Sequence, residues 1–244
     1  LPILEGYGLT ETSPVVAVNT ESEPRIGSVG RPIPGVDVRI AEDGEILVRG
    51  PNVMAGYYNQ PEATAEMIDG EGWLHTGDVG ELDTDGFLKI TDRKKDLIKT
   101  AGGKYVAPQP IENLVKTSKF VLNALVLGDR RRFPIILVVA NPGAVEAWMR
   151  ERQLRFVDLT TALKQSDVAA AIERDVMEKL QDLAHYELPK KVLLLDQDFT
   201  IESGELTPKL SVRRRVVESR YKERIDKLYE GAEHEPADEV GSEK

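Results

Sequence analysis

Cysteine is absent from this chain of 244 residues, and histidine occurs only three times. The absence of cysteine excludes disulfide bonds, thiolate catalysis and cysteine-ligated zinc, and it is typical of proteins from a reducing compartment. His75, His185 and His234 do not have the spacing of metal ligands. We therefore expect a packed or surface role for His75.

Long hydrophobic runs and a surplus of positive charge are missing as well. No apolar segment approaches the roughly 20 residues that a membrane-spanning helix requires, and the first residues do not resemble a signal region. The formal net charge of −10 makes nucleic acid an unexpected partner. With 41% hydrophobic residues, the chain can still bury a core in one or two domains.

Short strands and turns are expected in the first part of the chain. Val36, Val38 and Ile40 alternate with polar residues before Asp43-Gly44, and Ile46 to Val48 are apolar after it, which predicts a β-hairpin. Residues 83–86 predict a second hairpin turn. Residues 6–8, Gly-Tyr-Gly, predict a tight turn because glycine adopts conformations that other residues avoid. This pattern favours β-barrel-like packing.

The second part of the chain alternates strands and helices. Residues 121–127 and 135–139 are apolar and rich in β-branched side chains, which predicts a hairpin of two strands. Apolar residues recur at helical spacing over residues 166–184 and 216–229. A further helix is expected at residues 110–117, since proline is acceptable in a first turn. Residues 231–244 are acidic and poor in apolar side chains, so we expect a disordered tail there. The fold class predicted is therefore mixed α+β.

Four polar segments interrupt these elements and are candidates for ligand binding. YGLTETS (residues 7–13) crowds hydroxyls and a carboxylate into one loop after a strand, where open sheets place ligand groups. In HTGD (75–78), the short carboxylate of Asp78 suits the two hydroxyls of a ribose. DRKKD (92–96) and AGGK (101–104) follow. The alternatives are an ordinary polar turn, a self-capping Asp78 and a solvated charge run.

Together these segments resemble the adenylate-forming, AMP-binding acyl-CoA synthetases, and the long-chain fatty acid–CoA ligases most closely. The resemblance implies two reactions: ATP activates a fatty acid to acyl-AMP, and CoA then displaces AMP to give a thioester. It implies ATP and AMP, Mg²⁺ and CoA as cofactors or substrates, with fatty acid as the small-molecule partner. A cytoplasmic location is expected, and it is compatible with peripheral contact at the inner face of a membrane.

The resemblance also assigns roles to the first two segments. Tyr7, beside Gly8, matches the residue that stacks on adenine, and Thr10 matches a phosphate contact. Glu11 matches the carboxylate that helps to hold Mg²⁺, which prefers oxygen ligands. Asp78 matches the ribose-binding aspartate.

The later segments match the end of a large domain and the start of a small lid. Arg93 matches a second ribose contact, Lys95 matches the hinge, and Gly102 and Gly103 match the loop beside the pantetheine tunnel. The implied organisation is the carboxy-terminal part of the large domain over residues 1–91, then a lid over 92–230 with its hinge at 92–95.

The catalytic lysine of the family has an ambiguous counterpart. Aligning Leu206-Thr207-Pro208 and the following arginines without a gap places Ser211 where related sequences carry the lysine, with Lys209 two residues early. Either Lys209 serves after a local shift of the backbone, or the chain lacks this lysine. A further alternative is that Lys209 and the arginines form a solvated or phosphate-facing patch.

The phosphate loop that relatives carry upstream of YGLTET is not in this sequence. The chain also starts without methionine, in an apolar run, and we expect it to be the carboxy-terminal part of a longer protein. We therefore expect these 244 residues alone to be inactive. The alternatives are a non-catalytic nucleotide-binding or regulatory module of the same fold, and a ligase for another carboxylic acid.

Overall fold

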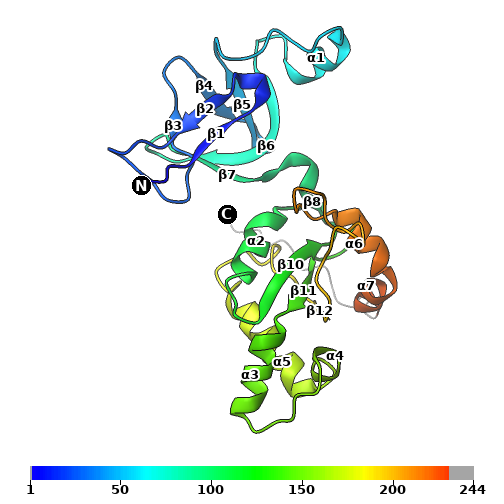
Figure 1. The fold of residues 1–244 in the computed structure, drawn as a ribbon. Coiled ribbons are helices and arrows are strands. Elements are labelled where there is room, and N and C mark those ends of the chain that lie inside the picture. Colours follow the sequence, from blue (N-terminus) through cyan, green and yellow to red (C-terminus); the bar gives the residue numbers. More distant parts are fainter. Residues whose placement is uncertain (1, 231–244) are drawn as a thin grey trace, which may run out of the picture. The chain divides into compact units, whose positions relative to one another are not determined.

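Two compact units divide the chain, with Leu97 ending the first and Ile98 beginning the second. The structure, a computed structural model, describes residues 2–230 (Figure 1). Both units combine helices with sheets, which confirms the mixed α+β class. The expected functional boundary at residues 92–95 remains a prediction, and the expected tail at 231–244 lies outside the described residues.

Antiparallel sheets make up most of the first unit. One sheet has the strand order β4-β5-β6-β7 and the other the order β1-β2-β3. The strands are β1 (Gly6–Gly8), β2 (Val15–Val18), β3 (Arg31–Pro32), β4 (Asp37–Ile40), β5 (Glu45–Arg49), β6 (Leu74–Leu82) and β7 (Leu88–Arg93). The helices are the short 3₁₀ helices η1 (Thr10–Thr12) and η2 (Lys94–Asp96), and α1 (Pro61–Met67).

Glycines in the left-handed region close two hairpins of this unit. Gly44 has a φ of 83° between β4 and β5, and Gly86 has a φ of 82° between β6 and β7. Both hairpins were expected from the sequence and are confirmed. Apolar residues on the inner faces of the two sheets then form one core, which includes Val16, Ile46 and Leu88.

The expected tight turn at residues 6–8 is wrong, because Gly6–Gly8 is strand β1. Gly6 pairs with Val18 of β2, and Gly8 pairs with Val15. A Cβ atom on Gly8 would lie 1.7 Å from the carbonyl oxygen of Pro14. Glycine is therefore needed here for close approach of two backbones, not for a positive φ.

Gly8→Ala is expected to destabilise the first unit by about 1–3 kcal/mol or more, since the added methyl group overlaps a backbone atom that cannot move aside. The midpoint of urea-induced unfolding measures this loss. Gly70→Ala is the matched control, because a Cβ atom there meets nothing within 4 Å and Gly70 does not have a positive φ. Equal stability of the two variants would contradict the close approach.

The second unit is built on a three-stranded sheet of order β10-β11-β12. β10 (Val121–Leu127) runs antiparallel to β11 (Ile135–Ala140), and β12 (Val192–Leu195) runs parallel to β11. A small hairpin of β8 (Ile98–Lys99) and β9 (Tyr105–Val106) precedes it. The helices are α2 (Pro108–Val115), α3 (Pro142–Glu151), α4 (Leu159–Ala162), α5 (Ser166–Glu178), α6 (Arg214–Arg220) and α7 (Lys222–Tyr229).

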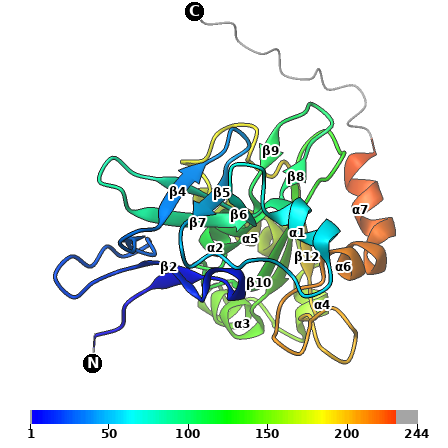
Figure 2. The same ribbon diagram turned by 90° about the horizontal axis from the view of Figure 1, so that it is seen from above.

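Both faces of this sheet are apolar, and each packs against a different set of helices. Ile136 and Val138 face a cluster that includes residues of α2, α3 and α5. Ile135 and Leu137 face the opposite cluster with α6 and α7, because successive side chains of a strand point to opposite faces. Figure 1 and Figure 2 show α6 and α7 following one another on one side of the sheet. This burial on both faces explains why β11 is apolar without alternation.

Three helix boundaries differ from the sequence-based expectation. The helix expected over residues 166–184 ends at Glu178, because the N–H groups of Leu180 and Leu183 bond three residues back in tight turns. The helix expected over 216–229 is divided at Tyr221, which has φ −99° and ψ 13°. The helix expected at residues 110–117 spans Pro108–Val115.

Candidate functional site

A cavity of about 450 Å³ opens in the first unit where β6 and β7 approach the segment after β7. It is lined by Leu9, Thr76, Gly77, Asp78, Arg93, Lys94 and Lys95. This volume is in the usual range for small-molecule sites. Two positions singled out from the sequence as ribose contacts, and the expected hinge residue Lys95, thus line one cavity.

Asp78 is the buried anion of this cavity. It belongs to the inward-facing set of β6, in which every second residue from Leu74 to Gly80 is buried. The hydroxyl of Tyr7 donates to Asp78 Oδ2 at 2.7 Å, and Arg93 Nε lies 3.3 Å from Oδ1. Arg93 is the cross-strand partner of Asp78 on β7. The fold therefore brings Tyr7, Asp78 and Arg93 together from three strands.

The Tyr7 hydroxyl is held in its protonated, donating form. Burial raises the pKa of Tyr7 well above its usual range, and its hydrogen bond to Asp78 raises it further. A carboxylate has about four acceptor positions. The contacts with Tyr7 and Arg93 therefore leave Asp78 able to accept further hydrogen bonds from a ligand.

Local backbone geometry aims Asp78 into the cavity. Gly77 has a φ of 70°, and the β6–β7 register shifts between Val79 and Gly80. A bulge of this kind re-aims side chains and is common beside functional sites. The Asp78 N–H donates to the hydroxyl of Thr76, which itself donates to the carbonyl oxygen of Ile46 at 2.7 Å.

Glu45 supports this arrangement and was missed by sequence reasoning. Its carboxylate is buried, with Oε1 accepting from the Gly77 N–H at 3.0 Å and Oε2 lying 2.8 Å from Lys94 Nζ. His75 Nδ1 lies 3.0 Å from the same Oε2. A glutamate directly after an Asp-Gly turn is expected to be an exposed hairpin residue, so nothing local in the sequence indicates that Glu45 is buried.

Glu45→Gln is expected to lower the free energy of unfolding at pH 7 by about 1–3 kcal/mol, because the amide cannot form the ion pair with Lys94. Burial opposes ionisation of Glu45, but hydrogen bonds from Lys94, His75 and Gly77 outweigh it and lower the pKa. The ionised carboxylate therefore stabilises the fold above its usual pKa of about 4.5, and this stability is lost as the pH falls from there through the lowered pKa of the folded state.

The difference between wild type and Glu45→Gln should accordingly narrow when urea unfolding is repeated near pH 3.5. Glu81→Gln is the control, since Glu81 pairs with Lys89 on the surface and is 63% exposed. A difference independent of pH would show that Glu45 acts by packing rather than by charge.

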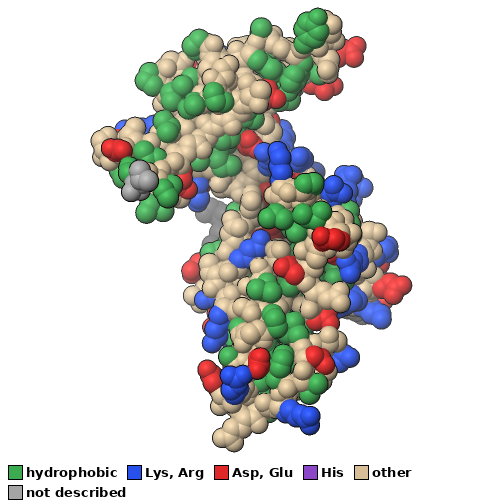
Figure 3. All heavy atoms as spheres, in the orientation of Figure 1, with side chains coloured by type: hydrophobic (Ala, Val, Ile, Leu, Met, Phe, Trp, Pro, Cys, Tyr) green, Lys and Arg blue, Asp and Glu red, His purple; other side chains and the backbone are tan. Residues whose placement is uncertain are grey.

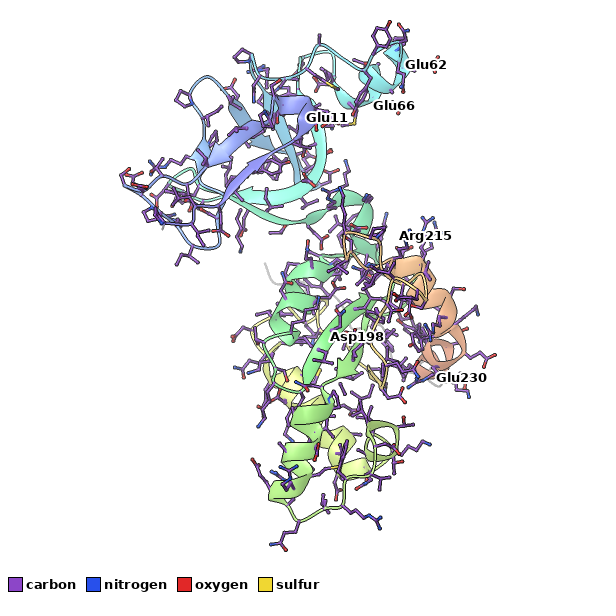
Figure 4. All side chains as sticks on the ribbon, in the orientation of Figure 1. Glu11, Glu62, Glu66, Asp198, Arg215 and Glu230 are labelled. Carbon is purple, nitrogen blue, oxygen red and sulfur yellow. The ribbon has the colours of Figure 1, made fainter. Side chains whose placement is uncertain are left out.

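Glu11 and Thr10 lie on η1, directly after β1, and Figure 4 labels Glu11 there. The buried hydroxyl of Thr12 shapes this loop by donating to the carbonyl oxygens of Leu9 and Pro14. Glu11 Oε1 accepts from the hydroxyl of Tyr57 at 2.9 Å, and Thr10 is exposed. Sequence reasoning did not single out Tyr57.

A protein cage for a metal ion is not found within residues 2–230, where no three Asp, Glu, His or Cys side chains cluster suitably. One oxygen of Glu11, Oε1, accepts from the Tyr57 hydroxyl. Mg²⁺ is usually held by one or two carboxylates together with substrate phosphates and water. Glu11 fits that mode and not an all-protein site.

Gly102 and Gly103 lie in the second unit, in the turn between β8 and β9. Gly103 has a φ of 79°, so this position requires glycine for its backbone conformation. The β8–β9 hairpin is fixed by two backbone hydrogen bonds of 2.8 Å, from Ala101 N–H to the Arg131 carbonyl and from Arg130 N–H to the Lys99 carbonyl. Both glycines are exposed.

Lys209 lies at the exposed tip of a small hairpin in the second unit, the orange loop before α6 in Figure 1. Thr207 N–H donates to the carbonyl of Ser211 at 2.9 Å, and Leu210, with φ 62°, turns the chain. Ser211 is on the returning side, and its N–H bonds to the Thr207 hydroxyl. Lys209 and Ser211 thus occupy different positions, the turn and its base.

Sequence comparison identifies the family of both units. Residues 1–58 match the AMP-binding enzyme family, and residues 95–233 match the AMP-binding enzyme C-terminal domain. A long-chain-fatty-acid–CoA ligase of Mycobacterium bovis is 41% identical over 230 residues, covering 94% of this chain and 38% of that protein. The peroxisomal long-chain acyl-CoA synthetase 7 of Arabidopsis thaliana is 34% identical, with 93% and 35% covered. The chain therefore spans about two fifths of these relatives.

Solved structures show the same fold. The A domain of a carboxylic acid reductase from Segniliparus rugosus, in complex with AMP and a co-purified carboxylic acid, gives a TM-score of 0.69 at 26% identity. It matches 93% of this chain and 35% of its own length. Apo MatB from Rhodopseudomonas palustris gives 0.63 at 28% identity, with 92% and 42% covered.

Within residues 2–230, no helix is both long enough and apolar enough to cross a membrane.

The matches over both units, the sequence identity to fatty acid–CoA ligases and the shared fold lead to one conclusion. The chain belongs to the AMP-binding enzyme family, in its acyl-CoA synthetase branch.

Proposed function

We propose that the whole protein is a long-chain fatty acid–CoA ligase. A fatty acid carboxylate oxygen attacks the α-phosphorus of ATP, pyrophosphate leaves, and acyl-AMP forms. The sulfur of CoA then attacks the acyl carbonyl, and AMP leaves as the thioester forms. The observation that carries this proposal is the buried Asp78 carboxylate, bonded to Tyr7 and Arg93, in a cavity of about 450 Å³.

The nucleotide is bound by the first unit in this proposal. The Asp78 carboxylate accepts the ribose hydroxyls through its remaining acceptor positions, and Arg93 donates to the ribose beside it. The ring of Tyr7 stacks on adenine, next to Gly8, and the exposed hydroxyl of Thr10 contacts phosphate. These assignments rest on the segments YGLTETS, HTGD and DRKKD, which resemble those of the family.

Mg²⁺ would be held by Glu11 together with oxygens of the ATP phosphates, and it would neutralise phosphate charge. The Tyr57 hydroxyl bonds to Glu11 Oε1 and orients the carboxylate. Tyr57 remains protonated while it does so, because the hydrogen bond to Glu11 is the main cause that raises its pKa.

The segment after β7, which ends the first unit, and the second unit supply the remaining groups. The Lys209 ammonium stabilises negative charge at the acyl carboxylate and the α-phosphate in the first reaction. Lys95 is the hinge, and residues 92–230 act as a lid that serves the two reactions in turn. Gly102 and Gly103 allow the β8–β9 turn to approach the pantetheine of CoA. We place the whole protein in the cytoplasm, where peripheral membrane contact gives access to fatty acids.

Pyrophosphate release by the full-length protein, with ATP, Mg²⁺ and a panel of carboxylic acids, tests the proposal. Release with palmitate, followed by palmitoyl-CoA formation on addition of CoA, is the expected result. Release only with short or aromatic acids would identify a ligase for another acid. ATP binding without any release would identify a non-catalytic nucleotide-binding module.

Residues 1–244 alone are expected to bind nucleotide without forming acyl-CoA, because their sequence does not contain the phosphate loop of the family. Robust turnover by this polypeptide would contradict that expectation.

A further inference from the structure

The hairpin that carries Lys209 has an ordered base. Arg213 N–H donates to the carbonyl of Glu205 at 2.7 Å, and Leu206 and Val212 form the next bridge toward the tip. The side chains of Leu206 and Val212 pack against the apolar cluster on the α6–α7 side of the sheet. The tip at Lys209 is exposed, so its position is set by what holds the base.

Glu205 is a buried anion at this base. Glu205 is only 1% exposed. The Ser203 hydroxyl donates to its Oε2 at 2.6 Å, and Arg220 Nη1 lies 3.0 Å from the same oxygen. Within the described residues, Oε1 is buried without a hydrogen-bond partner. A buried carboxylate with one oxygen unsatisfied is costly, so its retention needs a structural or functional reason.

Arg214 forms a second anchor immediately after the hairpin. Its Nη1 lies 2.8 Å from Glu112 Oε1 on α2 and 2.5 Å from the carbonyl oxygen of Val126 on β10. Glu112 is 8% exposed and also accepts the Val126 N–H at 2.8 Å. Nη1 of Arg214 is therefore engaged within the unit, while 25% of the side chain is exposed.

The other basic side chains of this run have a different setting. Lys209, Arg213 and Arg215 are exposed, and Figure 4 labels Arg215 near the start of α6. Lysine and arginine side chains are visible on this unit's surface in Figure 3. The run thus contains one half-buried cation, Arg214, and three exposed ones.

Both anchors act on the same short helix. Arg214 is the first residue of α6 and Arg220 the last. The two ion pairs therefore hold opposite ends of a helix that rises about 9 Å between them. The start of α6 is directly continuous with the hairpin base at Arg213. Loss of either pair would let helix and hairpin move together relative to the sheet.

We propose that Glu205, with Arg220, and Glu112, with Arg214, are positioning residues that place the Lys209 ammonium for acyl-AMP formation. This inference rests on the proposed ligase function. It goes beyond that function by naming the groups that set the geometry of the hairpin. Since a shift of about 1 Å in a catalytic group can cost roughly 100-fold in rate, small movements of the base have a large effect at the tip.

The test measures the two half-reactions separately in the full-length protein. Glu205→Gln is expected to slow pyrophosphate release by roughly 10- to 100-fold and to leave thioester formation from supplied acyl-AMP unchanged. The double variant with Lys209→Ala should be no slower than Lys209→Ala alone, because Glu205 acts through that lysine. Glu112→Gln should show the same pattern.

Arg150→Gln is the matched control, because Arg150 forms an exposed ion pair with Glu146 on α3 and should affect neither half-reaction. If Glu205→Gln does not fold, Arg220→Gln removes the same pair and is measured instead, with Arg220→Lys expected to recover part of the lost rate. The inference would be overturned if Glu205→Gln slowed both half-reactions equally, or if its effect on the rate added to that of Lys209→Ala in the double variant. In either case, pyrophosphate release by the wild type would still support the ligase function. No release by wild type would overturn both.

Discussion

Replacing Lys209 by alanine is expected to slow pyrophosphate release by roughly 100- to 1,000-fold, the usual cost of removing one group that stabilises developing charge. Thioester formation from supplied acyl-AMP should continue, because the ammonium of Lys209 is proposed to act in the first reaction only. The measurement is single-turnover kinetics of the full-length protein in each half-reaction. Lys222→Ala, an exposed lysine on α7 that is 70% exposed, is the control.

The hairpin makes the position of the ammonium testable as well as its presence. Lys209 is at the turn, whereas Ser211 is at the base with its N–H bonded to the Thr207 hydroxyl. If the turn delivers the ammonium, Lys209→Ala/Ser211→Lys stays inactive in acyl-AMP formation. If position 211 is the functional one, this double variant recovers activity. Unchanged release in Lys209→Ala itself would mean that another group serves.

Asp78→Ala is expected to weaken AMP binding at least about 100-fold. Two hydrogen bonds from ribose hydroxyls to a carboxylate contribute about 1.5 kcal/mol each at the low end, and about 1.4 kcal/mol corresponds to a factor of ten. Asp78→Asn should lose less, because its amide oxygen still accepts. Isothermal titration of AMP into the full-length protein gives the dissociation constants.

Asp37→Ala is the matched control for this experiment. Asp37 belongs to the same unit and pairs with Arg49 on the surface, with 64% of its side chain exposed. Thermal unfolding of Asp78→Ala is measured alongside, since Tyr7 and Arg93 lose a partner. A folded Asp78→Ala that binds AMP as wild type does would show that Asp78 only organises its own strand.

Local patterns were sufficient for much of the fold. The Asp43-Gly44 and Asp83–Gly86 turns follow from residues that adopt a left-handed conformation, which is a local property. Strands β10 and β11 follow from continuous apolar and β-branched residues between turn signals. The turn predicted at residues 6–8 was wrong because Gly8 pairs with Val15 in a strand, with the backbone of Pro14 close beside it, and the residue types alone do not indicate this pairing.

The sequence by itself determined the family, the order of its segments and the candidates Tyr7, Glu11, Asp78 and Arg93, because each lies in a contiguous motif. Only the tertiary structure decided which groups act together. Tyr7 meets Asp78 across 71 positions, Glu45 meets Gly77 across 32, and Arg214 meets Glu112 across 102. Such hydrogen bonds form when strands and helices pack, and they leave no periodic or local signal. A buried carboxylate such as Glu45 or Glu205 therefore looks like a surface residue until the fold supplies its partners.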